Sequence, residues 1–462
     1  MKESVNMSLA AIADVCEGSI TAGESNMIVS NITSDSRASD VGSLFVALKG
    51  NTFDGHDFVA ELIAKREVKA VLVQKQGFEG AAAKNGIGVV ICKDTRQALG
   101  KIAKRHRNSF NPKVIAVTGT NGKTTTKELI AAVLQSKFRI HKSEKNYNND
   151  IGLPFAVLGL QPEHEVAVFE IGMNHSGEIA ALSEIVRPNI GLITCVGEGH
   201  LEFLGSVENV ARAKMEIVQS MESGSLLILN RDSLYFDLMA ELAVGSGMRI
   251  KTFGLQDNAD IYPTEYSITA EQTAIIYSGE EISAPLYGIH NVYNLLATVA
   301  AAQEFGFTAA DIKGALADFN LLDGRSQIFD RGYIVINDTY NSNPLSSRYA
   351  IRSMKEIFPE RRKIAVLSDM KELGEASAKC HRDIGRLIAA EDIDLLCVWG
   401  DMADEYVEGG AMEGLNRCRV LDFNTKQDLI TYLRENITKQ DVVLIKGSRS
   451  MKMEEVVSAL VG

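Results

Sequence analysis

The sequence predicts an α/β fold divided into three domains. Its 462 residues are too many for one hydrophobic core, because domains usually contain about 100–200 residues. Short apolar runs typical of buried strands alternate with helix-like segments, which is the pattern of parallel sheets covered by helices. We therefore expect a small α/β domain at 1–108, a central parallel-sheet α/β domain at 109–321 and a Rossmann-like α/β domain at 322–462.

The first expected domain contains the apolar runs SLFVALKG, KAVLVQK and GVVICKD, with helix-like stretches such as FVAELIAKR among them. The polar and basic segment KRHRNSFNPK follows, and it ends at Pro112 and Lys113. A segment of this composition with a proline is typical of a linker. A new apolar strand starts directly after it, at Val114, so the first domain boundary is predicted near residue 108.

The two remaining domains show the same alternation. In the central one, VIAVTG, VAVFEIG, IGLITCVG and SLLILN alternate with helix-like segments such as KELIAAVLQS. In the third, the strand-like runs are YIVIND, KIAVLSD, DLLCVWG, CRVLDF and DVVLIKG. This pattern predicts doubly wound sheets, in which ligands bind at the carboxyl ends of the strands.

The composition argues against several classes of protein. A net charge of −12 is unfavourable for nucleic-acid binding, which depends on cationic side chains. The six cysteines lie far apart without a C-x-x-C pair, so neither a zinc site nor a disulfide framework is predicted. No signal-peptide pattern and no window of about 18 apolar residues occurs, so we expect a cytoplasmic protein that does not span a membrane.

The segment VIAVTGTNGKTTTKELIAAVL predicts a nucleotide-binding site, because a strand, a Gly-containing turn and a helix follow one another directly. Free backbone N–H groups at a helix N-terminus bind phosphates. We expect Lys123 to reach the β- and γ-phosphates and Thr124 to ligate Mg²⁺. The usual pattern has Gly where this chain has Val117, so the loop is a variant; the alternative is a surface turn. The expected contacts are Gly119, Thr120, Asn121, Gly122, Lys123, Thr124 and Thr125.

The same segment, TGTNGKTTT, resembles the ATP loop of the Mur ligases and of the related folylpolyglutamate synthetases. Seven further segments resemble Mur ligases in family order, over about residues 31–455: KNYNNDIGLP, FEIGMNHSGEI, GEGHLEFLGSVENVARAKMEI, GIHNVYNLLATVAA, NDTYNSNP, VLSDMKELG and LIKGSRSMKME. NDTYNSNP and DMKELG are similar to the branch of the family that adds a dipeptide. The D-N-P-R segment expected in the diaminopimelate- or lysine-adding branch is absent.

The resemblance implies an ATP-dependent ligase of peptidoglycan precursor synthesis. Its substrates would be UDP-N-acetylmuramoyl-tripeptide and D-alanyl-D-alanine, and it would form an acyl phosphate before the amine displaces phosphate. Because two anions must approach each other, cations are needed at the transferred phosphoryl group. We expect ATP and two Mg²⁺ ions as cofactors, and a monomer without nucleic-acid or membrane partners. The rival readings are a related ligase that adds a single amino acid and a non-catalytic nucleotide-binding regulator.

Three residues are candidates for the metal site in addition to Thr124. Glu170 ends the strand VAVFE at the expected ligand-binding edge, where the alternative is an exposed carboxylate. The resemblance implies His200 as a second ligand, although Mg²⁺ prefers oxygen. It also implies that Lys214 carries a carbamate formed from CO₂, which would help to hold Mg²⁺; the alternative is a solvated helix residue. The implied catalytic set is Lys123, Glu170, His200, Lys214 and Arg325.

Four residues are candidates for contacts with the nucleotide outside the loop. Asn291 and Asn294 lie three apart on a predicted helix, so both amides share a face and could recognise adenine. The alternative for Asn291 is a helix N-cap. Arg325, at the join to the third domain, could reach the γ-phosphate upon domain closure, or form an interdomain salt bridge. Asp338 ends the strand YIVIND and is expected to accept the ribose hydroxyls.

The resemblance implies that the first domain holds the UDP-sugar and that the third presents the dipeptide. Asp369 and Glu372 are expected to attract the incoming ammonium group. An Asn-rich turn also forms for local reasons, which is the alternative for several of these residues. The expected substrate contacts are Ser36, Arg37, Asp54, Gly55 and His56 for UDP, Asn146, Asn148 and Asn149 for the muramoyl peptide or phosphates, Asn341 and Asn343 for nucleotide or substrate, and Lys446, Ser448 and Arg449 for the dipeptide carboxylate.

Overall fold

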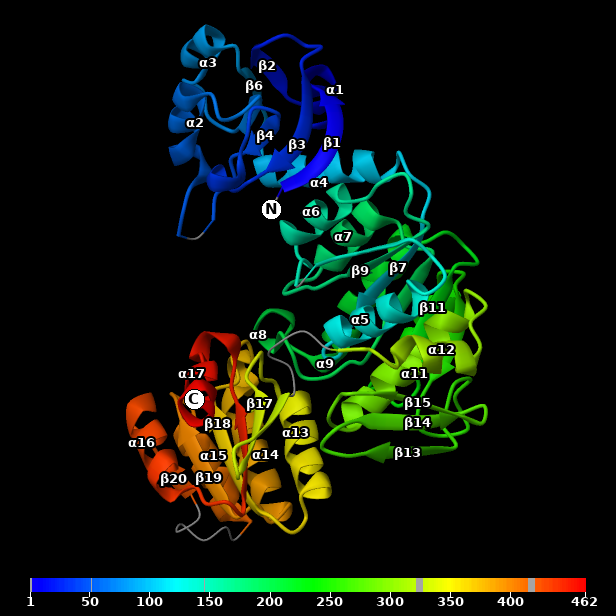
Figure 1. Ribbon diagram of the computed structural model, residues 1–462, viewed down its shortest axis with the longest axis vertical. Helices are drawn as coiled ribbons and strands as arrows, with labels where there is room; N and C mark the ends of the chain where they lie inside the picture. Colours follow the sequence, from blue (N-terminus) through cyan, green and yellow to red (C-terminus); the bar gives the residue numbers. More distant parts are fainter. Residues whose placement is uncertain (1, 51, 145, 321–326, 414–419) are drawn as a thin grey trace.

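The computed structural model describes residues 2–50, 52–144, 146–320, 327–413 and 420–462. Three α/β domains follow one another along a curved path, and the N-terminal and C-terminal domains lie at opposite ends of the central one (Figure 1). The predicted fold class is confirmed, because each domain contains a sheet with parallel strands. The boundaries at 108 and 321 stay predictions, and residue 321 lies outside the described segments.

The N-terminal domain contains a six-stranded mixed sheet with the order β1–β3–β4–β5–β6–β2. Strands β3 to β6 are parallel, and β1 and β2 pair antiparallel to them at the two edges. All residues of β4 and β5 are buried, as expected for strands covered on both faces. The elements are β1 (Lys2–Ser8), α1 (Leu9–Val15), β2 (Ser19–Ala22), β3 (Ile28–Thr33), β4 (Ser43–Val46), α2 (Val59–Lys65), β5 (Ala70–Val73), α3 (Glu79–Asn85), β6 (Gly88–Ile91) and α4 (Thr95–Arg107).

The central domain contains an all-parallel sheet with the order β12–β11–β10–β7–β9–β8. Its elements are β7 (Lys113–Thr118), α5 (Lys123–Leu134), β8 (Ile140–Lys142), α6 (Gly152–Leu158), β9 (Val166–Glu170), α7 (Glu178–Val186), β10 (Ile190–Ile193), α8 (Leu201–Leu204), α9 (Val207–Met215), β11 (Leu226–Asn230), α10 (Phe236–Gly245), β12 (Arg249–Phe253), α11 (Ile289–Gln303) and α12 (Ala309–Leu316). A three-stranded antiparallel sheet, which we did not predict, packs on α11 and α12 and consists of β13 (Glu265–Ile268), β14 (Thr273–Tyr277) and β15 (Glu280–Ala284).

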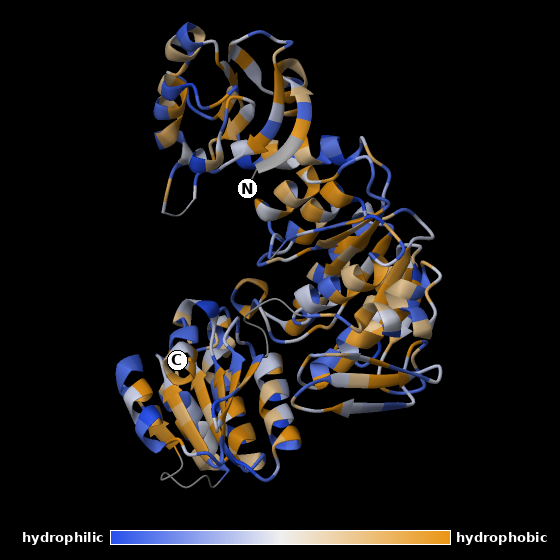
Figure 2. Cartoon of the chain, in the orientation of Figure 1, coloured by the Kyte–Doolittle hydropathy of each residue, from blue (hydrophilic) through white to orange (hydrophobic). Residues whose placement is uncertain are grey.

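The C-terminal domain has the strand order β16–β17–β21–β18–β19–β20, and only β16 is antiparallel to its neighbour. Its elements are β16 (Gln327–Asp330), β17 (Ile334–Asp338), α13 (Pro344–Ile357), β18 (Arg362–Ser368), α14 (Ser377–Ala390), β19 (Leu395–Trp399), α15 (Ala403–Met412), β20 (Val420–Asp422), α16 (Lys426–Asn436), β21 (Asp441–Lys446) and α17 (Glu454–Val461). Apolar residues concentrate on the strands of the three six-stranded sheets (Figure 2). None of the described helices combines the length and the hydropathy that a bilayer crossing requires.

The strand order brings the predicted functional segments to two facing sheet edges. The phosphate loop follows β7 and Glu170 ends β9, whereas Asp338 ends β17 and Lys446 ends β21. Contacts between the edges include the ion pair of Arg348 with Glu198 at 2.6 Å and the bonds from the Asn343 side chain to the phosphate loop. Ligands of open α/β sheets bind at the carboxyl ends of the strands, so the site is expected between these edges.

Candidate functional site

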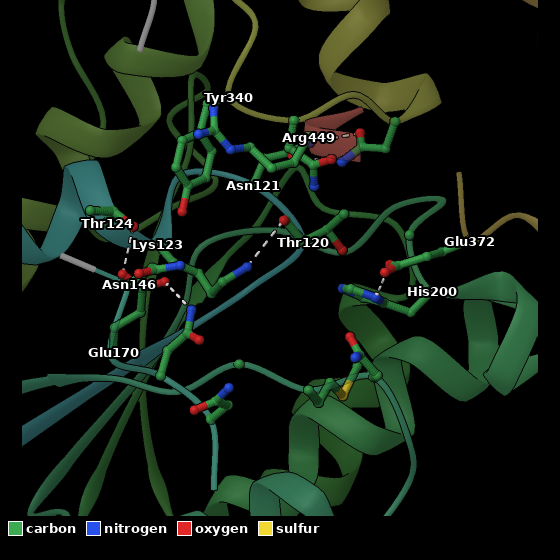
Figure 3. Close-up of a pocket in the computed structure, with 18 of the residues that line it drawn as sticks. Thr120, Asn121, Lys123, Thr124, Asn146, Glu170, His200, Tyr340, Glu372 and Arg449 are labelled. Carbon is green, nitrogen blue, oxygen red and sulfur yellow. Dashed lines mark hydrogen bonds and ion pairs between the residues drawn. The ribbon is translucent and has the colours of Figure 1, made fainter. Parts of the chain in front are cut away.

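A cavity of about 1180 Å³ lies between the central and C-terminal domains. Its lining includes the phosphate loop, the ends of β9 and β17, and the turn after β21. Gly50 and Arg96, from the N-terminal part of the chain, complete it. The cavity is large enough for a nucleotide with a second substrate beside it. Figure 3 shows its central residues.

The phosphate loop turns at two glycines that no other residue could replace. Gly119 has φ of 150° and Gly122 has φ of 80°, a region that favours glycine. A Cβ atom on Gly119 would lie 1.8 Å from Thr194 Oγ1, and one on Gly122 would lie 2.4 Å from Asn294 Oδ1. Val117, the departure from the usual pattern, lies inside β7 and pairs with β9 and β10. The turn starts only after Thr118, so the loop needs no glycine at position 117.

Lys123 and Asn121 show how the loop is held. The Lys123 ammonium donates to the carbonyl oxygens of Gly119 at 2.8 Å and Thr120 at 3.3 Å. Asn121 exchanges two hydrogen bonds with Asn343, at 2.8 and 3.2 Å. Lys123 thus stays partly exposed to the cavity, where its charge can meet a phosphate.

Glu170 meets the phosphate loop at its magnesium-binding position. One carboxylate oxygen accepts from Thr124 Oγ1 at 2.5 Å (Figure 3), and the other accepts from Asn148 Nδ2 at 2.7 Å. Glu170 is only 2% exposed, so the exposed-carboxylate alternative is wrong. A hydroxyl and a carboxylate are the oxygen ligands that Mg²⁺ prefers. No group of three or more His, Cys, Asp or Glu side chains with metal-site geometry occurs in the described segments.

Lys214, in the last turn of α9, is 1% exposed, so the alternative of a solvated helix residue is wrong. Burial lowers the pKa of its amine from 10.5 to about 7, and the nearby charge of Lys123 acts in the same direction. Burial of an ammonium is unfavourable without a charged partner. The neutral amine, which is the form that combines with CO₂, is therefore well populated near neutral pH.

His200 lies where α8 begins, in the left-handed conformation with φ of 57°. Its Nδ1 atom forms an ion pair with Glu372 of the C-terminal domain at 2.7 Å. The contact with His200 lowers the pKa of the Glu372 carboxyl. In Figure 3, His200 points toward Glu372, while Glu170 lies on the far side of Lys123. His200, a predicted metal ligand, thus pairs with Glu372, which was predicted to attract the incoming ammonium group.

Asn291 and Asn294 are both buried, and their amides are engaged. Asn294 Nδ2 donates to Asn291 Oδ1 at 2.8 Å, and Asn294 Oδ1 accepts from Thr126 of α5 at 3.1 Å. The N-cap of α11 is Gly288, so the capping alternative for Asn291 is wrong. Neither amide belongs to the cavity lining. Asn294 instead supports the phosphate loop, and the adenine role of the two residues stays a prediction.

The rings of His290 and Tyr349, which were not predicted as site residues, line the cavity where Asn291 and Asn294 do not. His290 directly precedes Asn291, and its ring stacks on Tyr349 with centroids 6.3 Å apart. Burial lowers the pKa of His290 to about 4, so the ring is neutral at pH 7. Its Nδ1 atom is buried and has no hydrogen-bond partner among the described residues. His290 lies within the motif GIHNVYN, which could have identified it as a site residue. No motif in the sequence points to Tyr349.

Asp338 and Lys446 lie opposite each other on the paired strands β17 and β21. The Lys446 ammonium donates to Asp338 Oδ2 at 2.6 Å and to the Asn341 carbonyl at 3.0 Å. Asn343 accepts from Ser346 N at 2.9 Å and caps α13, which is the local role that Asn turns often have. Asp338, Asn341, Asn343 and Lys446 all line the cavity, and their contacts with nucleotide or substrate stay predictions.

The remaining candidates of the third domain lie at the same edge. The Ser448 hydroxyl accepts from Lys371 N at 2.8 Å, and Arg449 is exposed beside Glu454 at 3.2 Å. The carboxylate of Asp369 is buried and accepts from Lys371 Nζ at 2.7 Å and from two backbone N–H groups. The charge of Asp369 is thus already balanced within the protein. Arg325 lies outside the described residues.

The UDP candidates of the first domain do not line this cavity. Arg37 is 88% exposed and pairs with Asp35 at 2.9 Å; Ser36 precedes it in a short 3₁₀ helix, Ser36–Ala38. Asp54 accepts from His56 Nδ1 at 2.6 Å and from Lys75 Nζ at 2.9 Å. These hydrogen bonds hold the pKa of Asp54 well below its usual range, and the hydrogen bond from Lys75 has the largest effect.

The turn around Gly55 is tightly packed, because a Cβ atom there would lie 2.8 Å from Leu48 N. The other set of predicted substrate contacts does line the cavity: Asn146, Asn148 and Asn149 follow β8. Asn149 accepts from Gly152 N at 2.8 Å and thereby fixes the start of α6.

Comparisons with known proteins agree along the whole chain. The Mur ligase family, catalytic domain, matches residues 28–107, the Mur ligase middle domain matches 117–302, and the Mur ligase, glutamate ligase domain, matches 324–449. UDP-N-acetylmuramoyl-tripeptide–D-alanyl-D-alanine ligase of Bacillus subtilis is 34% identical and covers 97% of both chains. The enzyme of the same name from Haemophilus influenzae is 35% identical over 99% of this chain and 98% of its own.

Solved structures give the same result for the fold. The structure of MurF from Acinetobacter baumannii superimposes with a TM-score of 0.89 and 29% identity, covering 99% of both chains. MurF ligase from Thermotoga maritima in complex with ADP gives a TM-score of 0.78 and 26% identity, over 93% of this chain and 96% of that one.

Proposed function

The chain belongs to the Mur ligase family, and on this premise we propose that it joins D-alanyl-D-alanine to UDP-N-acetylmuramoyl-tripeptide with cleavage of ATP to ADP and phosphate. The observation that carries the proposal is the end-to-end match to relatives that share this name. The match includes the third domain, so it extends beyond the ATP loop that all members need.

In the proposed reaction, a carboxylate oxygen of the tripeptide attacks the γ-phosphorus of ATP, the bond to the bridging oxygen breaks, and ADP leaves. The amine of the dipeptide then attacks the acyl carbon and loses a proton, and phosphate leaves. Lys123 and the N–H groups of the loop would stabilise the negative charge that develops on the γ-phosphoryl oxygens. The walls of the cavity would hold both substrates in line for the attack and keep water out.

Thr124, at the start of α5, and Glu170, at the end of β9, fit the magnesium ion that this chemistry requires. Thr124 and Glu170 supply two oxygen ligands 2.5 Å apart beside Lys123. Bound Mg²⁺ would neutralise phosphate charge during transfer. The buried amine of Lys214, whose pKa is about 7, fits a carbamate that would add an anionic oxygen ligand. For His200, a metal role requires that the ion pair with Glu372 opens.

We propose that the nucleoside binds at the side of the cavity where Asp338 of the C-terminal domain lies. Asp338 would accept the ribose hydroxyls, and the rings of His290 and Tyr349 lie at the same side of the cavity. Lys446 donates a hydrogen bond to Asp338 and is also the predicted contact of the dipeptide carboxylate. Its charge would therefore act on both the nucleotide-binding carboxylate and the dipeptide. Arg325 keeps its proposed role at the γ-phosphate after domain closure. The N-terminal candidates Ser36 and Arg37 keep their proposed role toward UDP.

We propose that the protein performs the reaction as a monomer. ATP and UDP-linked precursors are cytoplasmic metabolites, which favours a cytoplasmic site for it.

An isotope-transfer experiment distinguishes this function from that of a non-catalytic nucleotide-binding regulator. A tripeptide substrate labelled with ¹⁸O in the reacting carboxylate should transfer ¹⁸O to the released phosphate, because the carboxylate oxygen that attacks phosphorus leaves with it. Mass spectrometry of the phosphate measures the label. A regulator would release none, and unlabelled phosphate would indicate simple hydrolysis of ATP and contradict the acyl-phosphate step.

A further inference from the structure

Lys127 is a lysine on the phosphate-loop helix α5 that is completely buried, with 0% exposure. Its ammonium donates to the carbonyl oxygen of Ser143 at 2.6 Å and lies 3.0 Å from Glu128 Oε1. Burying a charge is unfavourable unless partners compensate it. Replacing a whole buried ion pair by apolar residues is often neutral for stability, whereas removing one partner is destabilising. A buried lysine one turn after Lys123 is therefore expected to serve the geometry of the site.

Ser143 connects Lys127 to the end of β9. It directly follows β8 and is fully buried, and its hydroxyl accepts from the backbone N–H of Glu170 at 3.0 Å. The helix α5 thus reaches Glu170 by two routes. One is direct, from Thr124 to the carboxylate, and the other passes from Lys127 through Ser143 to the backbone.

We propose that Lys127 is a positioning residue for the magnesium–nucleotide site: it anchors Ser143, and Ser143 fixes the backbone from which the Glu170 carboxylate extends to the phosphate loop. This inference rests on the proposed role of Glu170 as a magnesium ligand. Hydrogen bonds that orient a metal ligand commonly contribute about 10- to 100-fold to metal affinity. A carboxylate free to rotate away from Thr124 would lose that contribution.

A matched control is present in the same cluster. Lys142 also bonds to Glu128, but it is 39% exposed and its ammonium makes no recorded contact with Ser143 among the described residues. The substitution Lys142→Met removes one cation beside Glu128 and leaves the contact between Lys127 and Ser143. Any effect of general charge loss at Glu128 is thereby separated from the effect on the Glu170 backbone.

The test is the binding of ADP at a series of Mg²⁺ concentrations, measured by calorimetry on the full chain. Lys127→Met should raise the Mg²⁺ concentration that gives half of the full gain in ADP affinity by about 10-fold or more. Lys142→Met should leave it within about twofold of the wild type. A Lys127→Met protein that melts at a lower temperature but keeps the wild-type Mg²⁺ dependence would overturn the inference, because its role would then be purely structural.

Two further variants keep the test decisive if Lys127→Met does not fold. Ser143→Ala removes the acceptor for the Glu170 N–H group and should shift the Mg²⁺ dependence in the same direction; wild-type behaviour of this variant would overturn the inference. Glu170→Gln tests the premise separately. If Glu170→Gln leaves the Mg²⁺ dependence unchanged, the proposed metal role of Glu170 fails; if it shifts that dependence and Ser143→Ala does not, only the role of Lys127 fails.

Discussion

Lys123→Ala is expected to lower ligase turnover by about 1000-fold or more, into the background of the assay. The ammonium group lies on the phosphate loop and faces the cavity, where it would neutralise charge on the transferred phosphoryl group. Phosphoryl transfer depends mainly on positioning and charge stabilisation, so loss of this cation should lower the rate directly. Phosphate release with saturating substrates measures the effect.

The control for this variant is Lys137→Ala. Lys137 follows the end of α5 and pairs with Asp311 at the surface at 2.9 Å, so its loss should leave turnover within about twofold. Lys123 is partly exposed and donates to two loop carbonyls, so Lys123→Ala should melt within a few degrees of the wild type. Full activity of Lys123→Ala would remove the phosphate loop from the mechanism.

Lys214→Ala is expected to lower turnover by about 100- to 1000-fold, because the variant lacks the carbamate proposed as an anionic ligand of Mg²⁺. The buried site would contain space where the long side chain was, so formate or acetate should restore part of the activity by supplying a carboxylate. Turnover against carboxylate concentration measures the rescue. Wild-type turnover of Lys214→Ala without added carboxylate would contradict the proposal.

The wild type offers a second test of the same residue. At limiting bicarbonate its activity should rise as the pH increases through about 7, because the neutral amine, and not the ammonium, combines with CO₂. Saturating bicarbonate should weaken this dependence. A pH profile that is the same at both bicarbonate concentrations would argue that the amine acts unmodified.

The parts of the site that could be predicted are those set by local sequence. A strand, a tight turn and a helix place Lys123 and Thr124 within a few residues of one another, and Glu170 ends a strand whose neighbour carries the loop. Parallel pairing then brings these side chains together without further information. The same logic places Asp338 opposite Lys446, since both end adjacent strands.

The parts that were missed depend on contacts between distant segments. The pairs formed by His200 with Glu372 and by Asn121 with Asn343 cross two domains, and no periodicity in the sequence reports them. Asn291 and Asn294 do share a helix face, as predicted, but that face is buried against the phosphate-loop helix and not turned to the cavity. The antiparallel sheet β13–β15 has short strands with half-exposed residues, which gives a weak apolar pattern.

The most direct test of the central claim is the choice of amine. Purified protein with ATP, Mg²⁺ and UDP-N-acetylmuramoyl-tripeptide is offered D-alanyl-D-alanine, or D-alanine, lysine, diaminopimelate or glutamate singly, and both released phosphate and the mass of the product are measured. We predict phosphate release and a product enlarged by the dipeptide only with D-alanyl-D-alanine. Release with a single amino acid and none with the dipeptide would show that the chain is a different ligase of the same family.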